Sequence, residues 1–194
     1  MAARTVREVS ALLKGKAKVK IDWGCGSDKM PGHIGVDLRE LPGVDVICDL
    51  EAPPFPFPDD CACQMVASHI VEHIKPWKFI ALLDEWWRIM APEGLIAIAH
   101  PYGVNDLFIQ DPTHCNAINQ GTWQYFDPRY PLWGIYKPKP WRIQPGYPMY
   151  QVSGTMEVLM TKLEDEKDAR PGTGELSPAR TDGKRRSQNK GVSR

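Results

Sequence analysis

The sequence of 194 residues lacks paired cysteines, long apolar runs and an excess of either charge. Its five cysteines are Cys25, Cys48, Cys61, Cys63 and Cys115. They form no CxxC pair and, being odd in number, no complete disulfide framework, which argues against a structural zinc site and a secreted scaffold. The apolar stretches around Met65–Val71 and Leu95–Ala99 are far shorter than the roughly 20 residues that cross a bilayer. We therefore expect a soluble cytoplasmic protein with reduced thiols and no membrane contact.

The charge balance and the apolar content limit the class of protein further. The chain has 24 basic and 24 acidic side chains and is 42% apolar, which suits one domain without a general affinity for polyanions. Residues 1–16 read as a basic helical lead-in and residues 17–163 as the domain, with an insertion rich in proline and aromatic residues over about 105–148. From residue 164 to 194 aromatic residues vanish and charge, glycine and serine dominate, which predicts a disordered polar tail.

The apolar pattern within the domain alternates between short strands and a helix. Strands are predicted over Lys18–Trp23, His33–Leu38, Val44–Cys48, Gln64–Ser68 and Leu95–His100, with a final antiparallel pair over Tyr150–Thr155 and Met156–Lys162. The clearest helix is Pro76–Met90, where apolar residues recur at i, i+3, i+4 and i+7. The prolines of the insertion predict irregular backbone there, with its aromatic rings forming either a lid or a small core. This alternation predicts an α/β domain with a mainly parallel sheet.

Glycines and acids follow three successive predicted strands. Asp22-Trp23-Gly24-Cys25-Gly26 gives a D-x-G-x-G turn in which a ligand can lie directly against the backbone. Asp37 ends the next strand, where a carboxylate can accept hydrogen bonds from the hydroxyls of a ribose. Asp49 with Leu50 ends the third, where the pair could contact an adenine. Each acid alone is as well explained by a turn or a helix cap, but the ordered series favours a nucleoside ligand.

Two other nucleotide sites are excluded by spacing. The turn lacks the third glycine of a dinucleotide-binding G-x-G-x-x-G, and Asp37 follows it too soon. The chain also lacks the G-x-x-x-x-G-K-[ST] loop that binds a triphosphate.

Several segments together resemble class I S-adenosylmethionine-dependent methyltransferases, most closely the small single-domain group that acts on small molecules. They are the D-x-G-x-G turn, Asp37, Asp49-Leu50-Glu51, Pro56-Phe57-Pro58-Asp59, Ala67–His73 and Arg88–Gly94. The resemblance implies a doubly wound, mostly parallel Rossmann-like sheet with an antiparallel C-terminal edge strand in a single domain. It implies S-adenosyl-L-methionine as cofactor, bound by Asp22, Gly24, Gly26, Asp37, Leu38, Asp49, Leu50, Ser68 and His69. One departure is the link from Gly26 to Ile34, which is too short for the helix that usually follows the turn.

The histidines are the candidates for proton transfer. His114, in Asp111-Pro112-Thr113-His114, and His69 are the predicted catalytic residues, because a histidine can take a proton from an incoming oxygen or nitrogen nucleophile. A loop-stabilising role for His114 fits equally well. His69-x-x-Glu72-His73 has the order of an inverted zinc-protease motif, but no third ligand is identifiable. We therefore favour local hydrogen bonding and expect no metal, although a comparable Glu-His pair holds a divalent ion in a minority of similar enzymes.

We predict a methyltransferase that acts by SN2 displacement on an oxygen or nitrogen of a small-molecule acceptor. One alternative is a protein that binds S-adenosylmethionine or a nucleoside without catalysis. A nucleic-acid methyltransferase is a further alternative, suggested by basic residues at both ends, but the Asn/Asp-Pro-Pro-Tyr/Phe signature of base flipping is absent and we expect no nucleic-acid partner. The sequence does not indicate an oligomeric state.

Overall fold

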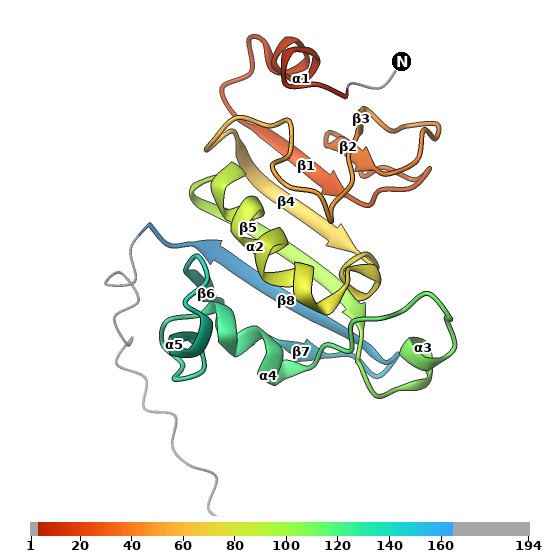
Figure 1. Cartoon of the computed structure of the whole chain (residues 1–194), viewed down its shortest axis with the longest axis vertical. Helices are drawn as coiled ribbons and strands as arrows, with labels where there is room; N and C mark the ends of the chain where they lie inside the picture. The colour runs from red at the N-terminus through yellow and green to blue at the C-terminus, as the bar shows by residue number, and fades with distance from the viewer. Residues whose placement is uncertain (1–3, 165–194) are drawn as a thin grey trace, which may run out of the picture.

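Figure 1 shows a computed structural model of the chain, which describes residues 4–164. These residues form one eight-stranded sheet in the order β3-β2-β1-β4-β5-β8-β6, with β7 paired to β8. The strands are β1 Val19–Trp23, β2 Ile34–Asp37, β3 Val46–Ile47, β4 Ala62–Ser68, β5 Met90–Pro101, β6 Trp141–Ile143, β7 Met149–Tyr150 and β8 Thr155–Lys162. Strands β1 to β5 pair in parallel, whereas β8 is antiparallel to β5, β6 and β7.

Two longer helices and several short ones accompany the sheet. The helices are α1 Val6–Leu13, α2 Phe79–Ile89, α3 Asp106–Ile109, α4 Gln120–Trp123 and α5 Trp133–Tyr136, with 3-10 turns η1 Val71–His73, η2 Pro76–Lys78 and η3 Gln124–Phe126. A capping box of Thr5 and Glu8 begins α1, in which each residue bonds the backbone of the other. Proline at the first position of η2 suits the start of the segment that continues into α2.

The predicted strands and the predicted helix are present, with three differences at the C-terminal side. Of the predicted strand Tyr150–Thr155, residues 151–154 form the turn that connects β7 to β8. The C-terminal strand is antiparallel as predicted, but it is not the outermost strand, because β6 pairs with its outer side. Strand β6 comes from the insertion that the prolines predicted to be irregular. Its three residues pair with the end of β8, and the indole of Trp141 is fully buried. Burial of this ring therefore outweighs the local proline content.

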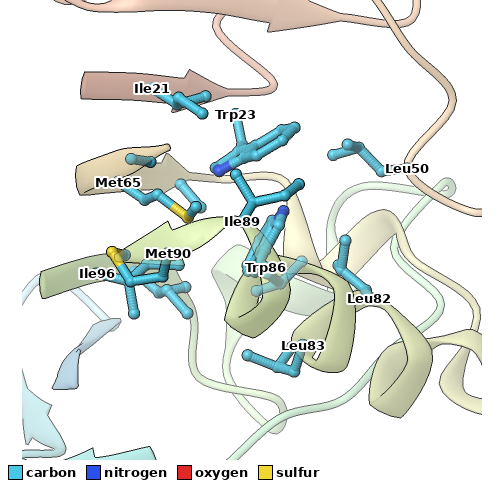
Figure 2. Close-up of a cluster of buried hydrophobic side chains, with 14 of the residues drawn as sticks. Ile21, Trp23, Leu50, Met65, Leu82, Leu83, Trp86, Ile89, Met90 and Ile96 are labelled. Carbon is cyan, nitrogen blue, oxygen red and sulfur yellow. The ribbon is translucent and has the colours of Figure 1, made fainter. Parts of the chain in front are cut away.

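The main core lies between the sheet and α2, which crosses in front of β4 and β5 (Figure 1). Inward residues alternate along the strands, as in β8, where every second residue is buried. Figure 2 shows Trp23 and Met65 of the sheet facing Trp86 and Ile89 of α2. The Trp23 and Trp86 rings have centroids 5.7 Å apart, and both side chains are fully buried. This packing holds the end of β1 against α2.

The opposite face of the sheet is only partly covered. Within residues 4–164, the links from β1 to β2 and from β2 to β3 contain no helix, which confirms the predicted short connection after Gly26. The strand order is that of a doubly wound sheet, but crossover helices are missing on this side. Val66, Ala97 and Leu159 of this face are only half-buried and line a shallow cavity of about 240 Å³ with Tyr147.

The predicted basic lead-in contains α1, whereas the predicted polar tail lies almost entirely outside the described residues. Among residues 4–164, no helix combines the length and the apolar character needed to span a bilayer.

Candidate functional site

The carboxyl ends of β1 to β4 meet at one edge of the sheet, because these strands are parallel. A cavity of about 800 Å³ lies at this edge. Six of the predicted cofactor residues line it: Gly24, Asp37, Leu38, Asp49, Leu50 and His69. Asp22 and Ser68 line an adjoining cavity of about 450 Å³, whose wall also contains Gly24. The acids of three successive strand ends are therefore grouped around two cavities that share Gly24.

The glycine turn after β1 packs tightly against its neighbours. Gly24 has φ +68°, and a Cβ atom there would lie 2.7 Å from Cγ1 of Ile70. The backbone N–H groups of Gly24 and Cys25 both donate to the carbonyl oxygen of Val36, at 2.8 and 3.1 Å. Gly26 lines neither cavity, but its φ of +55° also favours glycine. The turn thus lets the chain pass close to β2 and leaves its backbone in the cavity wall.

Asp37 is held by backbone donors on both sides. Its side chain is buried, Oδ2 accepts from the N–H of Gly26 at 3.0 Å, and Oδ1 accepts from the N–H of Arg39 at 2.9 Å. Oδ1 also accepts from Nε of Arg39 at 3.4 Å, so three of the roughly four lone-pair sites of the carboxylate are used and one on Oδ2 remains free. These bonds orient Asp37 before any ligand arrives.

Asp22 and Asp49 have different surroundings. The buried carboxylate of Asp22 accepts from the N–H of Met30 at 2.8 Å and so fixes the helix-free link between β1 and β2. Asp49 is exposed, and its Oδ1 accepts from the N–H of Glu51 at 2.8 Å in a local turn, while Leu50 beside it is buried. Asp22 thus shapes the site, whereas Asp49 presents its carboxylate at the cavity.

The far wall of the main cavity comes from the segment after β4. Lys75 pairs with Glu51 through both its backbone N–H and its ammonium group, which lowers the pKa of Glu51 and ties this segment to the β3–β4 link. Trp77 lines the cavity with 76% of its surface exposed. Trp77 was not predicted as a site residue, although an indole outside the apolar stripe of the predicted helix is a signal for an exposed binding surface.

Two thiols near the cavities are held in the protonated form. Burial, with the nearby charge of Asp49, raises the pKa of Cys48 to about 12. Burial and the charges of Asp22 and Asp37 raise the pKa of Cys25 to about 11. Cys48 lines the main cavity and Cys25 the adjoining one. Both are neutral thiols at physiological pH.

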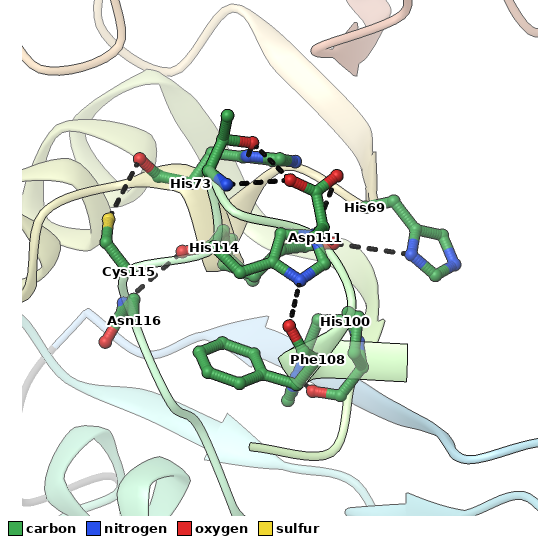
Figure 3. A network of polar contacts seen from close by, with 12 residues as sticks. His69, His73, His100, Phe108, Asp111, His114, Cys115 and Asn116 are labelled. Carbon is green, nitrogen blue, oxygen red and sulfur yellow. Dashed lines mark hydrogen bonds and ion pairs between the residues drawn. The ribbon is translucent and has the colours of Figure 1, made fainter. Parts of the chain in front are cut away.

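The two predicted catalytic histidines differ in their access to the cavity. His69 lines it, with a half-exposed side chain and φ +53°, and its Nδ1 lies 3.3 Å from Oε1 of Glu72. His114 does not line it, although its neighbours Thr113 and Cys115 do. The His114 side chain is 7% exposed, and its Nδ1 lies 2.9 Å from the carbonyl oxygen of Phe108. Figure 3 shows His114 in the same cluster of side chains as His69, His73 and His100.

Three side chains, one in this wall of the cavity and two behind it, could hold a metal ion. Single donor atoms of Glu72, His73 and His114 lie within 4.8 Å of one another. The sequence suggested only the Glu-His pair, because the third member is about 40 residues away along the chain. No local spacing rule could have found that residue.

The buried aromatic rings of the insertion belong to the main hydrophobic core. Trp123, Phe126 and Trp141 are buried, and the first two pack edge-on against Phe79 of α2 with ring centroids 5.7 and 5.5 Å away. Of residues 105–148, Thr113 and Cys115 line the main cavity, and none of the insertion's aromatic rings does. These three rings therefore form neither a lid nor a separate small core, because they pack into the main core of the domain.

Comparison with solved structures shows what fold this arrangement represents. A SAM-dependent methyltransferase from Archaeoglobus fulgidus is 18% identical, with a TM-score of 0.54 over 81% of this chain and 95% of that chain. An S-adenosylmethionine-dependent methyltransferase from Mesorhizobium loti is 11% identical, with a TM-score of 0.54 over 80% and 96%. The aminoglycoside resistance methyltransferase NpmB1 is 13% identical, with a TM-score of 0.53 over 82% and 94%. The chain has the class I methyltransferase fold.

Comparison of the sequence itself gives nothing further, since no protein-family model and no curated protein matches the chain.

Proposed function

We propose that the chain is an S-adenosylmethionine-dependent methyltransferase acting on an oxygen or nitrogen of a small-molecule acceptor. The observation that carries this proposal is the 800 Å³ cavity, where Gly24, Asp37 and Asp49 arrive from the ends of three successive strands. Ligand pockets of small molecules commonly have volumes of about 300–1,000 Å³. The methyltransferase fold of the chain supports the same function.

The residues present fit the proposed cofactor. Asp37 is buried and pre-oriented, with one free acceptor site for a ribose hydroxyl and a second site that becomes free when a hydroxyl replaces the exposed Arg39 side chain. The exposed carboxylate of Asp49 can accept from the amino group of adenine, with Leu50 against the ring, and Leu38 lies in the same wall. The backbone of Gly24 leaves room for the methionine portion, which would extend toward Asp22 and Ser68. Gly26 contributes indirectly by orienting Asp37.

Positioning is the main catalytic task. The cofactor would supply a methyl group on a positively charged sulfur, already a strong electrophile. The chain's residues must then hold an acceptor atom in line with the carbon–sulfur bond, and alignment of this kind can contribute about 7–11 kcal/mol. The left-handed backbone of His69, a sparsely populated conformation for a non-glycine residue, lies at this wall.

Among the two catalytic candidates, we assign proton removal from the acceptor to His69. It lines the cavity, and the buried Glu72 beside it stabilises the charged imidazolium that forms on protonation. His114 would act through its contacts behind the wall, as a positioning residue. A base is needed only for an acceptor that is protonated at the working pH.

The proposal is tested by isothermal titration with S-adenosylmethionine and S-adenosylhomocysteine. We expect one site per chain for both ligands, with weaker binding in Asp37→Ala and unchanged binding in Asp106→Ala, an exposed acid in the first turn of α3. No binding of either ligand to the folded wild-type protein would overturn the proposal.

A screen of acceptors with labelled methyl donor then separates an enzyme from a protein that only binds the ligand. Transfer that requires His69 supports the assigned role. Salt-sensitive retention on nucleic acid, with transfer to it, would contradict a small-molecule acceptor.

A further inference from the structure

Glu72 is an acid buried without a hydrogen-bond partner. Its side chain is fully buried in η1, and neither carboxylate oxygen receives a hydrogen bond. An isolated buried carboxylate is costly unless a cation or a set of donors compensates its charge. The groups nearest to it are imidazoles: Nδ1 of His69 lies 3.3 Å and Nε2 of His114 lies 3.9 Å from Oε1. A ring nitrogen of His73 lies within 4.8 Å of the other donor atoms.

The hydrogen bonds of His114 place a lone pair toward this carboxylate. Nδ1 lies 2.9 Å from the carbonyl oxygen of Phe108, which can only accept, so Nδ1 carries the hydrogen. In the neutral ring Nε2 is then unprotonated, yet it faces Oε1 of Glu72 at 3.9 Å and Oδ2 of Asp111 at 3.8 Å. A positive charge between these three acceptors, supplied by a proton or a metal ion, would stabilise all of them.

Nδ1 of His73 also donates a hydrogen bond to an oxygen atom. The hydroxyl of Thr113 donates to Oδ1 of Asp111 at 2.7 Å, so its oxygen accepts from Nδ1 of His73 at 3.0 Å. Nε2 of His73 is therefore the unprotonated nitrogen of the neutral ring. A histidine that donates one ring N–H to a carbonyl, or to a hydroxyl held by a carboxylate, has the outer contacts typical of metal-bound imidazole.

Backbone hydrogen bonds join the loop that carries His114 to η1, which carries Glu72 and His73. The N–H groups of Cys115 and Asn116 both donate to the carbonyl oxygen of Glu72, at 2.9 and 3.0 Å. The side-chain amide of Asn116 donates to the carbonyl oxygen of Val71 at 3.3 Å. The loop that carries His114 is thus fixed on η1, as Figure 3 shows. Mutual orientation of the donors does not depend on a bound ligand.

We propose that Glu72, His73 and His114 form a binding site for a divalent transition-metal ion. Two imidazole nitrogens and one carboxylate are a ligand set that suits Zn²⁺, Fe²⁺, Mn²⁺ or Co²⁺, and the set leaves coordination positions open. Asp111 supports the site from outside through Thr113, and His69 lies at its edge. This reverses the expectation of local hydrogen bonding without a metal.

The site adjoins the main cavity, because His69, His73, Thr113 and Cys115 line that cavity. An ion at Glu72 would therefore lie next to whatever occupies the cavity. The proposal nevertheless stands or falls on ion binding alone, whether or not the chain transfers methyl groups.

Metal-free protein titrated with Co²⁺ tests the proposal, followed by calorimetry and by the visible spectrum of the bound ion. We expect one ion per chain and a rise in melting temperature on binding. Glu72→Gln and His73→Gln should each weaken binding at least 10-fold. His33→Gln should bind as the wild type does, because His33 precedes β2 at the opposite end of the sheet. Circular dichroism verifies that each variant is folded.

Two results overturn the proposal. One is the absence of stoichiometric Co²⁺ binding in the folded wild-type protein. The other is wild-type affinity in the folded variants, with a sulfur-to-cobalt absorption band that places the ion on a thiolate. His73→Gln keeps the test decisive if Glu72→Gln does not fold, since His73 is not the fully buried member.

Discussion

Replacement of Asp37 by alanine examines the proposed contact with ribose. The carboxylate is buried and already accepts from the backbone N–H groups of Gly26 and Arg39, so its position is set before a ligand binds. Each hydroxyl that donates to a carboxylate contributes about 1.5–3 kcal/mol, but water can partly replace the lost acceptor in the variant. We expect a net loss of about 1–3 kcal/mol, or roughly 5- to 150-fold in Kd.

A double-mutant cycle separates this contact from any disturbance of the glycine turn. Calorimetry would compare S-adenosylhomocysteine with its 2′,3′-dideoxy analogue in the wild-type protein and in Asp37→Ala. The wild-type protein should bind the analogue more weakly, whereas the variant should hardly distinguish the two ligands. Equal discrimination in both proteins would refute the ribose assignment. Asp37→Asn serves as the control, because it keeps one acceptor oxygen for the N–H of Gly26.

Three further substitutions test the surroundings of the site. Gly24→Ala should lower the melting temperature and weaken cofactor binding, because the added Cβ would lie 2.7 Å from Cγ1 of Ile70 and a φ of +68° disfavours a side chain. An unchanged melting temperature and affinity would contradict the tight turn. Glu85→Ala should destabilise the fold by about 1–3 kcal/mol, measured by urea unfolding, since it strips the buried N–H of Phe55 of its acceptor. Burial raises the pKa of Asp84 above 3.8. As the pH rises from that value, the wild-type protein should therefore lose stability relative to Asp84→Asn. The same pH dependence of unfolding in both proteins would refute this.

The elements that the sequence predicts well are those whose burial pattern is local. Strands β1 and β2 are short, nearly continuous buried runs, and helix α2 carries the apolar period of an amphipathic helix. Strand β6 was missed, because its stability comes from pairing with β8 and from burial of Trp141, both set by distant residues. The partly covered second face follows from short links that were themselves visible in the sequence.

The candidate site also contains residues that the sequence predicts and residues that it does not. Asp37 and Asp49 were predictable because parallel strands bring successive carboxyl ends to one edge. The orientation of His114 was not, since it depends on the carbonyl oxygen of Phe108 and on a loop fastened to η1. Glu72 gave no signal of its burial, because a single acid in a polar motif is ordinarily exposed.

The neutral thiols at the ends of the strands affect how well the protein resists alkylation of its own side chains. A protein that holds an alkylating compound risks becoming its own substrate, and sulfur anions are the side chains most easily alkylated. Burial, reinforced by the nearby carboxylates, suppresses those anions at Cys25 and Cys48, which line the two cavities. The closely packed strand ends that would bind an adenosyl group thereby also protect these two thiols from methylation.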